Sequence, residues 1–166
     1  TFVDPDDPSQ GLIFAGRVVE DFKLDTGTFV HVGSLRVAAI AAASPVIQDA
    51  VVTGQDKPFV GLLAWPNLQA WRQIDGKPAA TLGEVIAAPA VIAALRRGLQ
   101  AHNASHPGSS TRIVRVLLLS EPPSIDGKEL TDKGYINQRA TLERRAVLVQ
   151  RLYAEPPAAD VIRVAD

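Results

Sequence analysis

The sequence predicts an α+β domain with a small mixed or antiparallel sheet, flanking helices and an N-terminal β-hairpin. Segments with strand character alternate with segments of helical periodicity along the chain. Short turn signals join the first strand-like segments, which suits antiparallel neighbours. The length of 166 residues, and 46% hydrophobic against 21% charged residues, fit a single folded domain over residues 1–166.

The first elements expected along the chain are a strand, a hairpin and a helix. Residues 11–19 have strand character, and the Asp-Thr-Gly turn signal that follows them predicts a hairpin with its tip near Gly27. From Ser34 the hydrophobic period becomes helical, which predicts a helix with Ser34 as its N-cap and Pro45 closing the segment.

The middle of the chain predicts an antiparallel strand pair followed by helices. Residues 47–56 and 58–66 are the two strands, and the second is nearly all apolar, so both of its faces should be covered. A short helix is expected around residues 68–74. Thr81, with a glutamate three residues later, has the pattern of a helix N-cap, and Pro89 predicts the start of a further helix.

The last third of the chain predicts one strand and one long helix. Residues 112–120 are the clearest strand, and the helical period runs from Tyr135 to Tyr153. We expect the tail after Asp160 to be loosely held. His102 and His106 lie four residues apart, but the polar residues around them indicate a frayed helix end, and no role is assigned to them.

Composition excludes several classes of function. The formal net charge of -1 provides no field to hold a nucleic-acid backbone or an anionic membrane, so neither is expected as a partner. The chain has no cysteine and only scattered histidines, so no metal site is expected. Without a membrane-spanning run or a signal peptide, we expect a cytoplasmic protein. The absence of methionine suggests a piece of a longer polypeptide or a processed product.

Two polar segments are candidates for chemistry. In GRVVEDFKLDTGTFV, residues 16–30, the charges taken alone are best explained as the solvated face of an exposed hairpin. The pair Gly16 and Arg17 could equally present a guanidinium to hydroxyl or phosphate oxygens, although such a dipeptide has little specificity.

The second segment is TDKGYINQR, residues 131–139, which holds Lys133 in a short polar loop. A lysine ammonium is a mobile point charge that can reach a carboxylate and a phosphate together. The alternative is that Thr131 or Asp132 caps the following helix while Lys133 points into water.

Together, and in this order, the two segments resemble those of the C-terminal domain of adenylate-forming ligases, and most closely the feruloyl-CoA synthase-like enzymes. The resemblance runs from Gly11 to Tyr153. It implies an enzyme that activates a carboxylic acid with ATP and Mg2+ and then transfers the acyl group to coenzyme A. In such enzymes the C-terminal domain is a lid that rotates between the two half-reactions, and the ATP and acyl sites belong to an N-terminal domain of the same chain, which is absent from these 166 residues.

The resemblance also implies roles for particular residues. Lys133 would bridge the acid and the ATP phosphate during adenylation. Gly16 and Arg17 would lie in the interdomain hinge, with Arg17 near the nucleotide ribose, and the hairpin around Lys23 and Gly27 would line the passage for coenzyme A.

The sequence departs from the family pattern after the Gly-Arg pair. Many relatives have an acidic pair one residue after Gly-Arg, whereas that position here is Val19 and the acids are Glu20 and Asp21. The pivot among these three residues is therefore left open. The alternative to the ligase is a stand-alone α+β interaction or ligand-binding module in which both segments are solvated loops.

Overall fold

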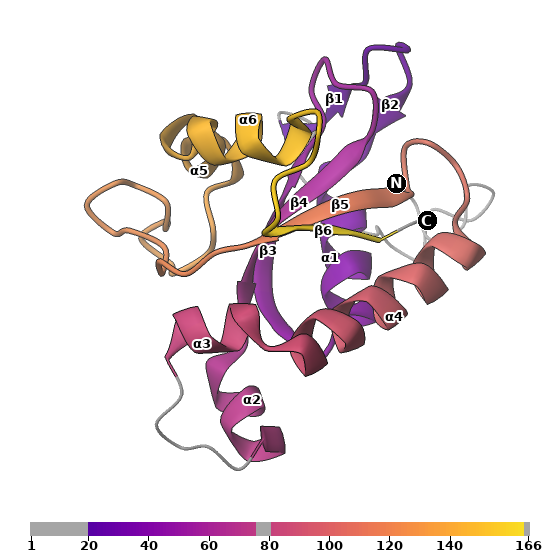
Figure 1. Ribbon diagram of the computed structural model, residues 1–166. Coiled ribbons are helices and arrows are strands. Elements are labelled where there is room, and N and C mark those ends of the chain that lie inside the picture. The colour runs from indigo at the N-terminus through magenta and orange to yellow at the C-terminus, as the bar shows by residue number, and fades with distance from the viewer. Residues whose placement is uncertain (1–19, 76–80, 165–166) are drawn as a thin grey trace, which may run out of the picture.

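The computed structural model describes residues 20–75 and 81–164, and it forms two sheets with helices around the larger one (Figure 1). The α+β class with an N-terminal hairpin and a small mixed sheet is thereby confirmed. The expected strand over residues 11–19 lies outside the described residues, and so do Gly16, Arg17 and Val19.

The hairpin consists of β1 (Phe22–Lys23) and β2 (Phe29–Val30), which pair antiparallel. The amide of Gly27 donates to the carbonyl of Leu24 over 2.9 Å, and Gly27 has a φ of 82°, a conformation that glycine adopts without steric cost. The predicted tip is therefore confirmed.

The larger sheet has the strand order β3-β4-β5-β6 and mixed pairing. Only the β4–β5 pair is parallel; β3 with β4 and β5 with β6 are antiparallel. Its strands are β3 (Ile47–Thr53), β4 (Val60–Pro66), β5 (Ile113–Leu118) and β6 (Val161–Arg163).

Helices cover both faces of this sheet, so the all-apolar strand β4 is buried along its whole length, as predicted. One face packs on α1 (Val32–Ala42), α3 (Leu82–Ala87) and α4 (Pro89–Ser105), and α2 (Leu68–Asp75) lies against α3. The opposite face packs on α6 (Ala146–Tyr153), next to α5 (Gln138–Arg144), which contacts β3. Among the described residues no helix has the length and apolarity to cross a membrane.

Two predictions about helix ends were wrong. The first helix begins at Val32 rather than after Ser34, because the carboxylate of Asp21 accepts the Val32 amide over 2.9 Å, and Ser34 lies inside the helix. The long helix from Tyr135 to Tyr153 is two helices, which meet at Arg145.

Two predictions of loose structure were also wrong. The tail after Asp160 forms β6, because Ile162 and Val164 are buried against the sheet. Helix α4 continues to Ser105, and His102 is buried with its Nε2 3.0 Å from the carbonyl oxygen of Thr111. The helix end is therefore packed and not frayed.

Candidate functional site

Lys133 lies at the tip of a closed turn between β5 and α5. The amide of Gly134 donates to the carbonyl of Thr131 over 2.8 Å, and the amide of Thr131 donates to the carbonyl of Tyr135 over 2.8 Å. A φ of 77° at Gly134 allows the chain to reverse there. These bonds fix the shape of the turn and point its middle residues outward.

The side chain of Lys133 is exposed and makes no hydrogen bond or ion pair with any residue that the structure describes. Its neighbour Tyr135 is 68% exposed, an unusual position for a large aromatic residue. The tip of this loop thus presents a free ammonium and an aromatic ring to solvent. The alternative that the preceding residues cap helix α5 does not hold, because Asn137 does so by accepting the amide of Ala140 over 3.2 Å.

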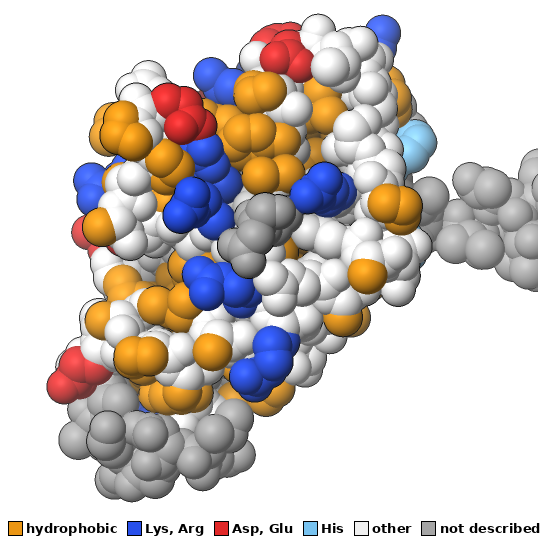
Figure 2. Space-filling model, turned by 45° about the vertical axis from the view of Figure 1, so that its right-hand side comes forward, with side chains coloured by type: hydrophobic (Ala, Val, Ile, Leu, Met, Phe, Trp, Pro, Cys, Tyr) orange, Lys and Arg blue, Asp and Glu red, His pale blue; other side chains and the backbone are white. Residues whose placement is uncertain are grey.

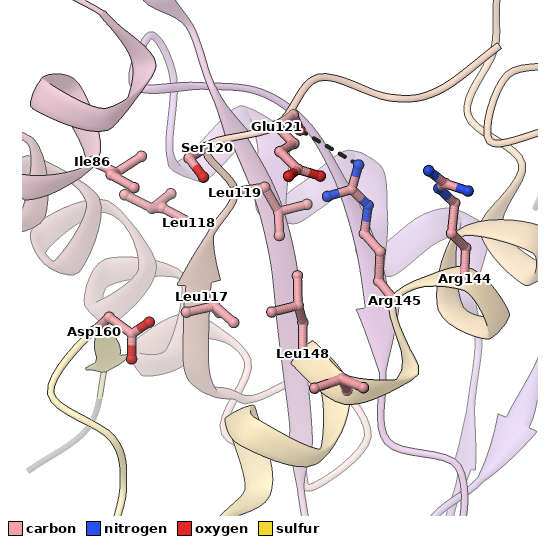
Figure 3. Close-up of a pocket in the computed structure, with 11 residues that line it drawn as sticks. Ile86, Leu117, Leu118, Leu119, Ser120, Glu121, Arg144, Arg145, Leu148 and Asp160 are labelled. Carbon is pink, nitrogen blue, oxygen red and sulfur yellow. Dashed lines mark hydrogen bonds between the residues drawn. The ribbon is translucent and has the colours of Figure 1, made fainter. Parts of the chain in front are cut away.

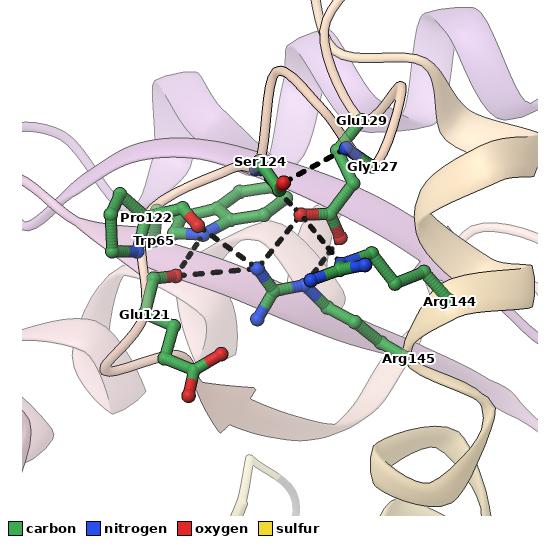
Figure 4. Close-up of polar contacts among 8 residues, drawn as sticks. All are labelled: Trp65, Glu121, Pro122, Ser124, Gly127, Glu129, Arg144 and Arg145. Atoms are coloured by element: carbon green, nitrogen blue, oxygen red, sulfur yellow. Dashed lines mark hydrogen bonds and ion pairs between the residues drawn. The ribbon is translucent and has the colours of Figure 1, made fainter.

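Beneath the turn, a buried ion pair joins Glu129 to Arg145 (Figure 4). The Glu129 side chain has 0% exposure, and its Oε1 and Oε2 accept from Nε and Nη2 of Arg145 over 2.6 and 3.0 Å. Oε2 also accepts the backbone amide of Ser124 over 2.7 Å. The carboxylate is therefore held by a two-pronged charged contact and one backbone donor.

The pKa of Glu129 reflects opposing effects. Burial raises the pKa of this carboxyl group, but the hydrogen bonds from Arg145 and Ser124, with the charges of Arg145 and Arg144, lower it below its ordinary value. Glu129 is therefore ionised at neutral pH.

Arg145 also binds the chain that leads into the loop. Its Nη2 donates to the carbonyl of Pro122 over 3.1 Å, and its guanidinium carbon lies 5.4 Å from the centroid of the Trp65 ring. Trp65 on β4 donates from Nε1 to the carbonyl of Glu121 over 2.9 Å. The residues before the loop are thus bound to both the sheet and the junction between α5 and α6.

A surface pocket of about 470 Å³ lies beside this ion pair (Figure 3). Leu117 and Leu119 from β5 and the following residues, and Leu148 from α6, form part of an apolar lining. Arg144 and Arg145 complete one side of it, so the arginine of the ion pair also lines the pocket.

The hairpin that carries Lys23 and Gly27 is bound to the loop between β3 and β4. The amide of Asp25 donates to the carbonyl of Lys57 over 3.1 Å, and the amide of Asp56 donates to the carbonyl of Lys23 over 3.0 Å. Lys23 and Gly27 themselves are exposed. The hairpin and the Lys133 loop project from different sides of the domain (Figure 1), so the structure does not bring these predicted site residues together.

Glu20 and Asp21 lie just before the hairpin, and of the two only Asp21 has side-chain hydrogen bonds within the part of the chain that the structure describes. Its carboxylate is 8% exposed and contacts Nδ1 of His31 over 3.0 Å as well as the amide of Val32. Glu20 is half-buried. These two contacts fix the Asp21 side chain to the start of α1.

Sequence reasoning missed Glu129 and Arg145. One signal was available: Arg145 falls on the same helical face as the buried residues Thr141 and Leu152, where a charged side chain indicates a buried partner. The identity of that partner, 16 residues away in a loop, could not be read from the sequence.

The hairpin, the mixed sheet and the exposed lysine loop make up an α+β domain, and its fold is consistent with the C-terminal domain of adenylate-forming enzymes. The family model described as the AMP-binding enzyme C-terminal domain matches residues 34–156, and the chain belongs to this family. No curated protein sequence matches the chain.

Solved structures with the same fold include two adenylation domains of carboxylic acid reductases. One is the A-PCP didomain from Segniliparus rugosus in complex with AMP, with a TM-score of 0.65 and 21% identity over 93% of this chain and 19% of that chain. Another is the adenylation domain from Mycobacterium chelonae, with a TM-score of 0.62 and 20% identity over 84% of this chain and 20% of that chain. The chain thus spans about a fifth of the length of these structures.

Proposed function

We propose that residues 1–166 are the mobile lid domain of an ATP-dependent acid-CoA ligase, completed by an N-terminal domain of the same polypeptide in the cytoplasm. The observation that carries this proposal is the free ammonium of Lys133 at the tip of a closed turn, in a chain of the AMP-binding enzyme family. An aromatic carboxylic acid, as in feruloyl-CoA synthase-like enzymes, is the proposed substrate.

Lys133 acts by electrostatic positioning in this proposal. Its ammonium lies between the carboxylate of the acid and the phosphate of ATP, and stabilises negative charge as the acyl-phosphate bond forms and pyrophosphate leaves. An exposed lysine with no partner among the described residues needs no internal ion pair to be broken before it acts.

The other ligands are bound mainly outside this chain. Among the described residues, no group of three or more His, Asp or Glu side chains could hold a metal ion, so the Mg2+ that ATP requires is proposed to lie in the N-terminal domain. Coenzyme A would pass along the hairpin with Lys23 and Gly27. Gly16 and Arg17 are proposed to lie in the interdomain hinge, with Arg17 near the nucleotide ribose.

The contacts of Asp21 support a pivot on its N-terminal side. Because Asp21 is bound to His31 and to the start of α1, it moves with the lid. Val19 and Glu20 are therefore the proposed pivot positions.

The experiment is a comparison of two lysine variants in the full-length enzyme. Lys133→Ala should lower acid-dependent ATP-pyrophosphate exchange by about 10²- to 10³-fold, the usual cost of a lost transition-state contact, and spare transfer from preformed acyl-adenylate to coenzyme A. Lys23→Ala likewise removes one exposed positive charge, from the hairpin. It should lower transfer to coenzyme A and spare pyrophosphate exchange. Equal damage to both half-reactions by Lys133→Ala would contradict the assigned role.

The structural neighbours favour a second candidate, the adenylation domain of a carboxylic acid reductase. The same assay separates the two proposals, because the ligase releases a coenzyme A thioester into solution. Adenylation without transfer to free coenzyme A would support the reductase. An absence of pyrophosphate exchange with every acid tested would support a binding module.

A further inference from the structure

We propose that Glu129 and Arg145 are positioning residues for Lys133. Through their buried ion pair they fix the base of the loop over residues 130–136, and thereby hold the ammonium where it acts. This inference rests on the proposed function of Lys133.

Lys133 depends on the base of its loop because it has no anchoring contact of its own among the described residues. The hydrogen bonds within the turn join Thr131 to Gly134 and Tyr135, and so fix the turn's shape but not its direction relative to the sheet. That direction is set where the two legs of the loop meet the domain.

The first leg is fixed by Glu129. Its side chain is bound to Arg145, and its carbonyl oxygen accepts the amide of Asn137 on the other leg over 2.8 Å. Leu130 and Ile136 form an isolated antiparallel bridge directly above this bond. Glu129 thus joins the first leg of the loop both to the second leg and to the junction between α5 and α6 (Figure 4).

The second leg is fixed without charge by Gln138, which is 3% exposed. Its amide group pairs with both backbone groups of Val52 on the edge strand β3: Nε2 donates to the carbonyl over 2.5 Å and Oε1 accepts from the amide over 3.1 Å. With this leg held on the sheet, the contact between Glu129 and Arg145 determines how the loop is tilted about it.

A buried ion pair is suited to this task because it is directional. The guanidinium fork and the two carboxylate oxygens allow one relative orientation, whereas an apolar contact of similar size tolerates sliding. Removing one partner leaves the other charge buried and unpaired, which drives the local structure to rearrange. A displacement of about 1 Å at a group that must contact reacting atoms can lower a rate about 100-fold.

The test is Glu129→Gln in the full-length enzyme, with Glu143→Gln as a matched control. Glu143 lies on α5 and pairs with Arg139 over 2.8 Å, but both side chains of that pair are exposed. Glu129→Gln should lower kcat for acid-dependent ATP-pyrophosphate exchange by about 10- to 100-fold and leave KM for ATP and transfer from preformed adenylate unchanged. Glu143→Gln should match wild type.

A double variant separates positioning from general damage. If Glu129 acts through Lys133, Glu129→Gln should cause no further loss in a Lys133→Ala background. The same loss in both backgrounds would overturn the inference. A wild-type exchange rate for Lys133→Ala would refute the proposed function of Lys133 and the positioning role with it. If Lys133→Ala lowers the exchange rate but Glu129→Gln does not, the positioning role alone is overturned.

Arg145→Lys decides the question if Glu129→Gln fails to fold, as judged by circular dichroism. This variant keeps the buried positive charge and removes the guanidinium group that donates to both carboxylate oxygens of Glu129. We expect a loss of about 10-fold in exchange, absent in the Lys133→Ala background. A wild-type exchange rate for folded Arg145→Lys would overturn the inference.

Discussion

Helices α1 and α4 cross at Gly98, and we expect Gly98→Ala to destabilise the domain. A Cβ atom at position 98 would lie 2.1 Å from the carbonyl oxygen of Ala42 and 3.0 Å from its carbonyl carbon. Both atoms belong to the backbone of α1, so no side-chain rotation can relieve the contact. The two helices would have to separate by roughly 1 Å, which disturbs well-packed side chains.

Two opposing terms decide the magnitude. Alanine is a better helix former than glycine by about 1 kcal/mol, which favours the variant. Overpacking of a filled core typically costs about 1 to 3 kcal/mol, and here Leu35 of α1 and Leu95 and Leu99 of α4 are all buried in one core. Because the contact is with the backbone, we expect a net loss of about 2 kcal/mol and a fall in Tm of about 4 to 8 °C.

Gly83→Ala is the control, because Gly83 is also helical but the nearest atom to its added Cβ is Thr81 Oγ1 at 3.9 Å. It should be neutral or stabilise the domain by up to about 1 kcal/mol. Both values come from urea unfolding of this chain, with the midpoint and slope compared across variants. If Gly98→Ala proves as stable as Gly83→Ala, α1 and α4 can slide apart freely, and the reasoning from their contact is wrong.

Two further predictions concern the hairpin and a buried tyrosine. Under the proposed function, Gly54→Ala should slow transfer to coenzyme A and spare pyrophosphate exchange, because its Cβ would lie 2.9 Å from the ring of Phe22 in β1 at a φ of 150°. Equal loss in both assays would contradict this. Burial raises the pKa of Tyr153 to about 12 from 10.0, so this phenol stabilises the fold below pH 10 and loses that contribution as the pH rises toward 12. Urea unfolding at pH 9 and 11 should show a smaller loss in Tyr153→Phe than in wild type, and identical losses would refute the assignment.

Elements specified by neighbouring residues could be predicted from the sequence. The hairpin follows from a glycine that accepts a φ of 82°, and helix α3 begins directly after Thr81, its N-cap, because the Thr81 hydroxyl accepts the amide of Glu84. Strands β3 and β4 are joined by a short loop, so their antiparallel pairing is also local.

Elements specified by residues far away in the sequence could not be predicted from the sequence. Helix α1 begins at Val32 because Asp21, 11 residues earlier, accepts its amide. The interruption at Arg145 coincides with a bond to Glu129, and the apolar period of the helix continues across it. The exposed position of Lys133 was consistent with the sequence, whereas the ion pair beneath it needed three-dimensional contacts to be found.

The positions of the Lys133 loop and the hairpin bear on how a lid domain could take part in two half-reactions. The Lys133 loop and the hairpin project from different sides of the domain (Figure 1). Both segments are bound to the same sheet. The loop is held by the hydrogen bond from Gln138 to Val52 of β3, and the hairpin is held by bonds to the turn that follows β3. Under the proposed function, rotation of the domain as a unit leaves both attachments intact, and a pivot before Asp21 also preserves its contacts with His31 and Val32.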